Sequence, residues 1–184
     1  MENKIMISGF GGQGVMLIGQ LLGYTAKDVD KKSTFYPAYG PEQRGGTANC
    51  TIVISDNEIG SPVPTKIDTL MALNQPSIDK YLDKIKSGGT LIINSNHVKQ
   101  KVDRNDISIY EVPADDLARE LGFAKAANMV MLGAYAEANN ILTQEQILST
   151  LKVQLARKAE FFDLNKAAIV KGSETIKNQV GEGF

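Results

Sequence analysis

The sequence predicts an α/β domain with a largely parallel sheet and a helical C-terminal third. Along the first two thirds of the 184 residues, short apolar runs alternate with segments whose apolar residues recur at helical spacing. The last third has the helical spacing alone. Since no Pro/Ser-rich linker or internal repeat interrupts this pattern, we expect residues 1–184 to form a single Rossmann-like domain.

A strand, a glycine turn and a helix are expected at the start of the chain. The apolar run at residues 4–8 stops at Gly9, and residues 15–27 then repeat apolar side chains at helical spacing. Two extended segments are expected next, at residues 33–39 and at residues 47–55, because these stretches are rich in aromatic or β-branched residues. A polar loop that contains glycines joins them.

Three further strands are predicted in the middle of the chain, at residues 67–73, 90–94 and 107–112. These runs alternate with helices, and strands connected in this way usually pair in parallel. Ligands of such sheets bind beyond the carboxyl ends of the strands, and we expect a ligand site there.

Two helices are predicted between and after these strands. The first is expected at residues 75–86, where Gly88 and Gly89 would end it. The second is expected at residues 113–121, with Asp115 and Asp116 in its first turn, where the helix dipole favours acidic residues.

The C-terminal third is predicted to be helical over residues 128–139, 143–155 and 164–180. Thr143 followed three residues later by Gln146 has the form of a capping box at the start of the second of these helices. Residues 181–184 are expected to be a loose tail.

Composition and charge exclude several classes of function. Twenty Lys and Arg against 21 Asp and Glu give a net charge of −1, so no overall basic field attracts nucleic acid or an anionic membrane. No apolar run is long enough to span a bilayer, and the N-terminus has no signal-peptide core. We therefore expect a cytoplasmic protein that binds neither nucleic acid nor a membrane.

The chain is poor in residues that ligate metals or act as nucleophiles. It has one cysteine, Cys50, and one histidine, His97, so it can form neither an internal disulfide nor a Cys/His cluster for zinc or iron–sulfur ligation. Any redox metal is therefore expected on a partner. Cys50 lies on a predicted strand and is interpreted as a small buried hydrophobe, and His97 as an exposed loop residue.

A glycine-rich loop follows the first predicted strand. Gly9, Gly11 and Gly14 spell G-x-G-x-x-G between a strand and a helix, where a permissive backbone and unpaired helix N–H groups bind anions. The loop is not a P-loop, because no Gly-Lys-Ser/Thr follows it. An NAD site would also need an acid at the end of the second strand, and Phe35, Tyr36 and Pro37 occupy that region. The alternative is that the glycines only allow tight packing of helix on strand.

A second loop, residues 39–46, contains one of only four arginines. Arg44 is followed by Gly45 and Gly46, and a guanidinium in such a loop suits bidentate binding of phosphate or carboxylate. Glu42 would pair with Arg44 or face a partner. The alternative is a solvated turn with an ordinary surface arginine.

These motifs resemble the gamma subunit of the 2-oxoacid:ferredoxin oxidoreductases. The resemblance rests on four segments, which read Gly9-Phe-Gly-Gly-Gln-Gly-Val15, Tyr39-Gly-Pro-Glu-Gln-Arg-Gly-Gly-Thr-Ala-Asn49, Leu73-Asn-Gln-Pro76 and Asn128-Met-Val-Met-Leu-Gly-Ala134, in order over nearly the whole chain. The second segment is more similar to the 2-oxoglutarate and branched-chain members than to the pyruvate members. Asn128 is interpreted as a cap of its helix.

The resemblance implies a subunit of a larger enzyme. That enzyme oxidatively decarboxylates a 2-oxoacid, transfers the acyl group to coenzyme A and passes electrons to ferredoxin. The resemblance places thiamine diphosphate, Mg and iron–sulfur clusters on partner subunits, namely the alpha, beta and ferredoxin-like delta subunits. For this chain it implies no catalytic residue, no metal ligand and no activity in isolation.

The two loops together are expected to contribute to coenzyme A binding and to assembly of the complex. The candidate binding residues are Gly9, Phe10, Gly11, Gly12, Gln13, Gly14, Val15, Tyr39, Gly40, Pro41, Glu42, Arg44, Gly45, Gly46, Thr47 and Asn49.

Two alternatives from other classes remain open at this point. The glycine loop also fits a stand-alone NAD(P)-dependent Rossmann oxidoreductase, although the ribose-binding acid is missing. It also fits a nucleotide-sensing module without chemistry. The sequence does not identify the 2-oxoacid, because the pocket that reads it is expected on other chains.

Overall fold

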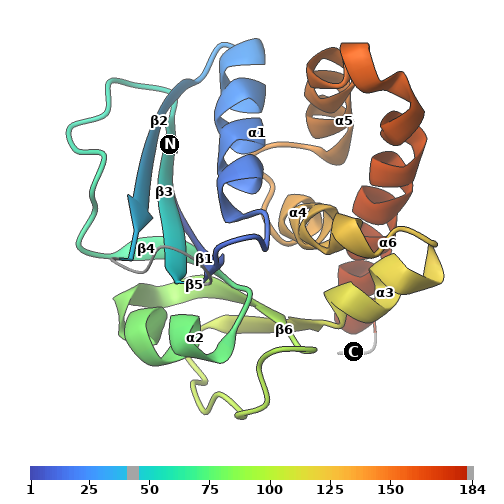
Figure 1. The fold of residues 1–184 in the computed structure, drawn as a ribbon. Coiled ribbons are helices and arrows are strands. Elements are labelled where there is room, and N and C mark those ends of the chain that lie inside the picture. The colour runs from blue at the N-terminus through green and yellow to red at the C-terminus, as the bar shows by residue number, and fades with distance from the viewer. Residues whose placement is uncertain (41–45, 182–184) are drawn as a thin grey trace.

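A computed structural model describes residues 1–40 and 46–181. It forms one six-stranded sheet in the order β2-β3-β1-β4-β5-β6, covered by helices on both faces (Figure 1). The strands are β1 (Glu2–Phe10), β2 (Lys32–Tyr39), β3 (Thr47–Ser55), β4 (Ile67–Ala72), β5 (Ile85–Asn94) and β6 (Ser108–Val112). The α-helices are α1 (Val15–Asp28), α2 (Gln75–Tyr81), α3 (Ala114–Glu120), α4 (Ala127–Ala138), α5 (Gln144–Gln154) and α6 (Phe162–Gly181), with short 3-10 turns at Leu82–Lys84, Ala124–Ala126 and Ala156–Phe161.

The predicted fold class is confirmed. The pairs β1–β4, β4–β5 and β5–β6 are parallel, whereas β3 pairs antiparallel with both β1 and β2. The C-terminal third is helical, as the periodicity predicts, and the capping box between Thr143 and Gln146 is present at the start of α5. Within the described residues, no helix has the length and apolar character needed to cross a bilayer.

The sheet divides the core into two layers because alternate side chains of a strand point to opposite faces. On one face, Ile5 and Ile7 of β1 pack with α1, α4 and α6 in the larger cluster. On the other face, Met6 of β1 and Leu70 of β4 pack against Ile78 of α2. The helices that follow β1 and β4 therefore leave the sheet on opposite faces, and such a reversal opens a crevice between the two strands at their carboxyl ends.

The prediction of a helix over residues 75–86 is wrong at its C-terminal end. The helix α2 stops at Tyr81, and β5 already begins at Ile85. Gly88, at φ 78°, and Gly89 lie inside β5 beside an irregularity in its pairing with β4. A Cβ atom on Gly89 would lie 2.8 Å from the Asp68 carbonyl oxygen, so this glycine allows two backbones to approach closely rather than ending a helix.

The second strand is extended, as predicted, but it does not occupy the Rossmann position. β2 is the edge strand of an antiparallel pair with β3 and does not neighbour β1. The place where a dinucleotide-binding fold carries its ribose-binding acid is therefore absent from this sheet. This disfavours the NAD(P)-dependent alternative.

Two glycines bring α4 and α6 into close contact. A Cβ atom on Gly133 would fall on the backbone carbonyl of Ile169, and one on Gly172 would fall on that of Val130. Both carbonyls belong to the partner helix, so the two backbones touch without intervening side chains. This contact joins the C-terminal helix to the layer that covers the sheet.

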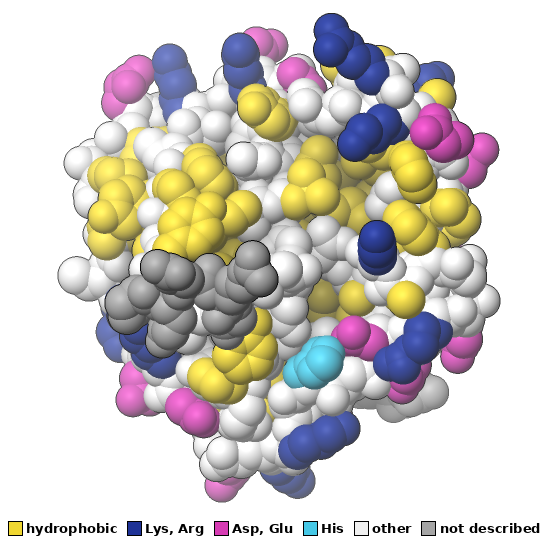
Figure 2. All heavy atoms as spheres, viewed as in Figure 1, with side chains coloured by type: hydrophobic (Ala, Val, Ile, Leu, Met, Phe, Trp, Pro, Cys, Tyr) yellow, Lys and Arg dark blue, Asp and Glu magenta, His cyan; other side chains and the backbone are white. Residues whose placement is uncertain are grey.

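Apolar side chains are also exposed along the β2 edge, which we define as Phe35, Tyr36 and Tyr39 of β2 with Tyr24 of α1. Figure 2 shows hydrophobic side chains gathered over β2 and the adjoining side of α1. An edge strand with exposed aromatic side chains is typical of a surface that another chain covers.

Candidate functional site

A cleft of about 380 Å³ lies at the carboxyl ends of the parallel strands. Each of these four strands supplies part of its wall from the residues at or just after its end, as expected for a parallel sheet. The lining residues are Gly12, Gln13 and Gly14 after β1, Leu73 after β4, Asn94 and His97 at the end of β5, Asp115 after β6, and Ala124, Lys125, Ala127 and Asn128 at the start of α4.

The glycine-rich loop forms one wall of this cleft. Gly12 and Gly14 have φ angles of 94° and 79°, a conformation that favours glycine. Gly14 precedes α1 without a side-chain cap, and the first turn of α1 has no acidic residue, so no N-cap side chain among the described residues competes with an anion for its backbone N–H groups. The predicted anion-binding turn therefore has the required geometry.

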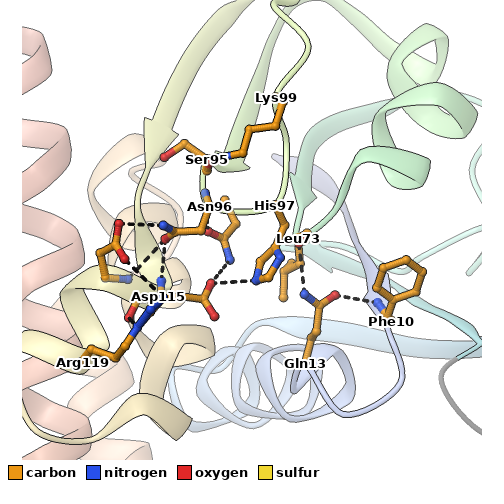
Figure 3. A network of polar contacts seen from close by, with 11 residues as sticks. Phe10, Gln13, Leu73, Ser95, Asn96, His97, Lys99, Asp115 and Arg119 are labelled. Carbon is orange, nitrogen blue, oxygen red and sulfur yellow. Dashed lines mark hydrogen bonds and ion pairs between the residues drawn. The ribbon is translucent and has the colours of Figure 1, made fainter.

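Gln13 holds this loop in place. Its Oε1 accepts a hydrogen bond of 2.6 Å from the Phe10 backbone N–H, and its Nε2 donates to the Leu73 carbonyl at 3.2 Å. These contacts join the end of β1 to the end of β4 (Figure 3). A Cβ atom on Gly9 would lie 2.6 Å from the same Oε1, so Gly9 is needed to make room for this side chain.

The opposite wall is a polar network around Asp115 (Figure 3). Its Oδ2 accepts a hydrogen bond of 2.7 Å from Asn94 Nδ2 and lies 3.1 Å from Nε2 of His97, whose side chain is 45% exposed. Asn96 caps α3, because its Oδ1 accepts the backbone N–H groups of Asp115 at 2.9 Å and of Asp116 at 3.3 Å. Asp115 and Asp116 lie in the first turn of α3, as predicted.

The sequence interpretation of His97 as an exposed loop residue is incomplete. The side chain is exposed, but it also lines the cleft and contacts a carboxylate. Asn94, His97 and Asp115 come from two strand ends about twenty positions apart, and no local spacing indicates their contact. The expectation that ligand groups lie beyond the carboxyl ends was the one signal that pointed to them.

The described flanks of the second loop lie next to the glycine loop. The Gly11 backbone N–H donates to the Gly46 carbonyl at 2.9 Å, and the Gly40 backbone N–H donates to the Thr47 carbonyl at 2.7 Å. Tyr39, at the end of β2, is 71% exposed. These described flanks thus lie beside the glycine loop, although they do not line the cleft.

Several other candidate residues have separate positions. Asn49 donates from Nδ2 to the Tyr81 hydroxyl at 3.1 Å. Val15, the first residue of α1, has its side chain buried in the larger core cluster. Phe10 is exposed at the end of β1. Pro41, Glu42, Arg44 and Gly45 lie outside the described residues.

Cys50 is buried, as predicted, and lies beneath α1, where its Sγ is 3.5 Å from the Val15 carbonyl. Burial raises the pKa of the thiol to about 12, because the protein interior solvates the thiolate poorly.

We expect the Cys50 thiol in the folded chain at pH 8 to resist a thiol-specific disulfide reagent that reacts readily after unfolding in guanidinium. The raised pKa leaves almost no thiolate, and burial blocks access. The absorbance of the released thiolate measures the rate. A native rate comparable with that of the unfolded chain would show that Cys50 is accessible and reactive.

The described residues contain no group of three or more His, Cys, Asp or Glu side chains placed to hold a metal ion. The whole chain has one cysteine. One cysteine does not supply the thiolate ligands of an iron–sulfur cluster. The cleft combines backbone N–H donors, side-chain amides and Lys125 with one carboxylate, that of Asp115, and with His97 on the opposite wall.

Comparison with protein families shows which family the chain matches. Residues 4–175 match the family described as pyruvate ferredoxin/flavodoxin oxidoreductase.

Two curated relatives differ in how much of their own length the chain covers. The 2-oxoglutarate synthase subunit KorC of Methanocaldococcus jannaschii is 37% identical over 96% of this chain and 95% of its own length. The ketoisovalerate oxidoreductase subunit VorA of Methanothermobacter thermautotrophicus is 38% identical over 97% of this chain, but this chain spans only 37% of it. The same domain thus occurs in relatives of similar length and as part of a longer polypeptide.

Two solved structures have the same fold. The gamma subunit of a keto/oxoacid ferredoxin oxidoreductase from Geobacter sulfurreducens superposes with a TM-score of 0.85 at 30% identity, over 97% of this chain and 98% of that one. The 2-oxoglutarate:ferredoxin oxidoreductase from Magnetococcus marinus, solved with 2-oxoglutarate, coenzyme A and succinyl-CoA bound, gives a TM-score of 0.87 at 23% identity, over 96% of this chain and 31% of that one.

Proposed function

Because the chain belongs to the pyruvate ferredoxin/flavodoxin oxidoreductase family, we propose that it is the gamma component of a multi-subunit 2-oxoacid:ferredoxin oxidoreductase. The enzyme would decarboxylate a 2-oxoacid oxidatively, form the acyl-CoA and reduce ferredoxin. The observation that supports this best is the match to KorC over nearly the full length of both chains. The Geobacter gamma subunit, which is also matched over nearly its full length, supports it further.

The substrate proposed is 2-oxoglutarate or a branched-chain 2-oxoacid. The two relatives are named for 2-oxoglutarate and for ketoisovalerate, and they are about equally similar to this chain. The pocket that chooses between these acids belongs, in this proposal, to other subunits.

Partner subunits would hold thiamine diphosphate, Mg and the iron–sulfur clusters, because this chain has one cysteine and its described residues hold no group of three or more His, Cys, Asp or Glu side chains placed for a metal ion. The partners would be alpha and beta subunits and a ferredoxin-like delta subunit, with ferredoxin as the electron acceptor, in the cytoplasm. The exposed aromatic side chains of the β2 edge offer a surface for one such contact.

This chain would contribute to the binding of coenzyme A. The coenzyme has phosphate groups, and the cleft has a glycine loop at the uncapped start of α1. The bound coenzyme A named for the Magnetococcus structure is consistent with this role. We propose the glycine loop, Gly9 to Gly14, as the main contact, and Arg44 of the second loop as a further contact.

We expect the purified chain alone to reduce no viologen dye with any 2-oxoacid. Dye reduction should appear only when the chain is combined with its alpha, beta and delta partners, because in this proposal those chains bind the cofactors. Affinity purification from the source cell followed by a dye-reduction assay measures both points. Activity of the isolated chain, or a purified homo-oligomer that reduces NAD, would contradict the proposal.

A further inference from the structure

The junction between α5 and α6 is a surface that the proposed function does not use. We define the junction as residues 152–166, which comprise the last turn of α5, the 3-10 turn Ala156–Phe161 and the first turn of α6. None of these residues is buried, and the 3-10 turn is exposed along its whole length. A surface element normally buries one face against the core, so the packing of this chain alone does not explain the junction.

Large apolar side chains are exposed on the junction. Val153 is 68% exposed, Phe161 37% and Leu164 36%. The ring of Phe161 stacks on that of Phe123, with the ring centroids 6.0 Å apart, and this contact anchors the turn to the segment between α3 and α4. Apolar groups that are held in place, exposed and rimmed by polar residues mark a site where another molecule binds.

The junction is basic, although the chain as a whole has a net charge of −1. It has two acidic residues, Glu160 and Asp163, and four basic ones, which are Lys152, Arg157, Lys158 and Lys166. Within residues 1–40 and 46–181, no carboxylate lies within ion-pair distance of these four cations. Figure 2 shows Lys and Arg side chains beside hydrophobic ones over α5 and α6, at the upper right. The cations of the junction are therefore available to carboxylates of another molecule.

Charge complementarity decides which kind of partner the junction fits. Cations around exposed apolar groups attract an acidic protein surface that has apolar groups of its own, since protein interfaces combine an apolar centre with a charged rim. An anionic membrane fits less well. Helices that lie on membranes need a continuous apolar face, and the carboxylates of Glu160 and Asp163 would meet anionic headgroups here.

We propose that the α5–α6 junction binds an acidic face of a partner subunit. This rests on the proposed function, in which the chain is one component of a multi-subunit enzyme. Val153 and Phe161 would be covered by apolar groups of the partner, while Arg157 and Lys158 would pair with its carboxylates. The β2 edge lies on the other side of α1 (Figure 1), so the chain would have two separate contact surfaces.

The test is a reversal of charge on the 3-10 turn. Arg157→Glu/Lys158→Glu alters two exposed side chains, so the melting temperature should stay close to that of the wild type. The alpha, beta and delta subunits are titrated in turn into the chain by calorimetry. For one of them the dissociation constant should rise on the order of tenfold or more in the variant, because like charges then face one another. The affinity of the wild-type chain for that subunit should decrease as salt is added.

Two further variants accompany it. Lys80→Glu/Lys101→Glu makes the same charge change at exposed positions on the α2 side of the sheet and should leave the affinity unchanged. Val153→Gln removes an exposed apolar side chain without a loss of helix propensity, and it should weaken binding several-fold with an unchanged dependence on salt. If Val153→Gln and Arg157→Glu/Lys158→Glu both bind with the wild-type affinity, the inference is wrong.

Hydroxyl-radical footprinting separates this inference from the proposed function. Phe161 and Leu164 should be oxidised more slowly in the assembled complex than in the isolated chain. If the complex reduces the dye while these side chains are oxidised as fast as in the isolated chain, the inference is overturned and the proposed function stands. If a partner protects them but no 2-oxoacid supports dye reduction, the proposed function fails and the docking surface stands.

Two other outcomes also count against the inference. A wild-type chain that assembles with none of the three subunits overturns both the inference and the proposed function. Binding of the isolated chain to phosphatidylserine vesicles, if Arg157→Glu/Lys158→Glu abolishes it, would assign the junction to a membrane and overturn the inference alone.

Discussion

Replacing Gly172 with alanine is expected to lower the free energy of unfolding by about 2 to 3 kcal/mol, even though alanine is the better helix former. The added Cβ atom would fall on the backbone carbonyl of Val130 in α4. Backbone cannot move aside as a flexible side chain can, so α6 must shift away from α4 and lose packing along its buried face. Gly133 occupies the reciprocal position against Ile169, and its substitution should have the same effect.

Thermal unfolding followed by circular dichroism measures this effect, which corresponds to a decrease in Tm of about 5 to 10 °C for a domain of this size. Gly23→Ala is the matched control. Gly23 also lies in a helix, α1, but a Cβ atom there would meet only the Ser33 Oγ, at 3.9 Å. The control should leave the Tm unchanged or raise it, because alanine in place of glycine inside a helix raises the free energy of unfolding by up to about 1 kcal/mol. A wild-type Tm for Gly172→Ala would mean that the contact between α4 and α6 is looser than the structure shows.

Gly12→Val is expected to produce the largest loss of coenzyme A use, with the KM in the reconstituted complex raised by about tenfold or more. Gly12 has a φ angle of 94°, and a Cβ atom there meets no atom of the described residues within 4 Å. The valine side chain would therefore not disturb the core and would instead enter the space where a phosphate approaches the loop. The positive φ adds a backbone cost of about 1 to 2 kcal/mol, which lowers the Tm by a few degrees.

Gly88→Val separates the two consequences of Gly12→Val. Gly88 has a φ angle of 78°, and a Cβ atom there meets no atom of the described residues within 4 Å. It lies near the start of β5, whereas the cleft lies at the opposite, carboxyl ends of the strands. It should lose a similar amount of stability and keep the wild-type KM. Steady-state kinetics with varied coenzyme A measure both variants. If both have the same KM, the glycine loop does not contact the coenzyme and serves only the packing of α1 on β1.

The sequence by itself determined most of the local structure. Apolar periodicity located every strand and every α-helix of the described residues, and the succession of strand, glycine turn and helix along the chain predicted an anion-binding turn after β1. Its main error, the helix extended to residue 86, arose because paired glycines indicate a helix end and a strand irregularity equally well. The close backbone approach at Gly89 distinguishes the two, because a Cβ atom there would lie 2.8 Å from the Asp68 carbonyl oxygen of β4.

Only the tertiary structure decided what faces the glycine loop. Asn94 and His97 lie at and just after the end of β5, and Asp115 lies in α3. Asn128 lies inside the first turn of α4, where Ala126 is the N-cap. The four residues Asn94, His97, Asp115 and Asn128 line one cleft because β1, β4, β5 and β6 end at the same edge of the sheet. The order of strands in a sheet depends on which surfaces pack together over long separations, and helical or strand periodicity contains no information about it. For the same reason the sequence described Asn128 as a cap and His97 as a loop residue: the groups they contact are distant along the chain and adjacent only after folding.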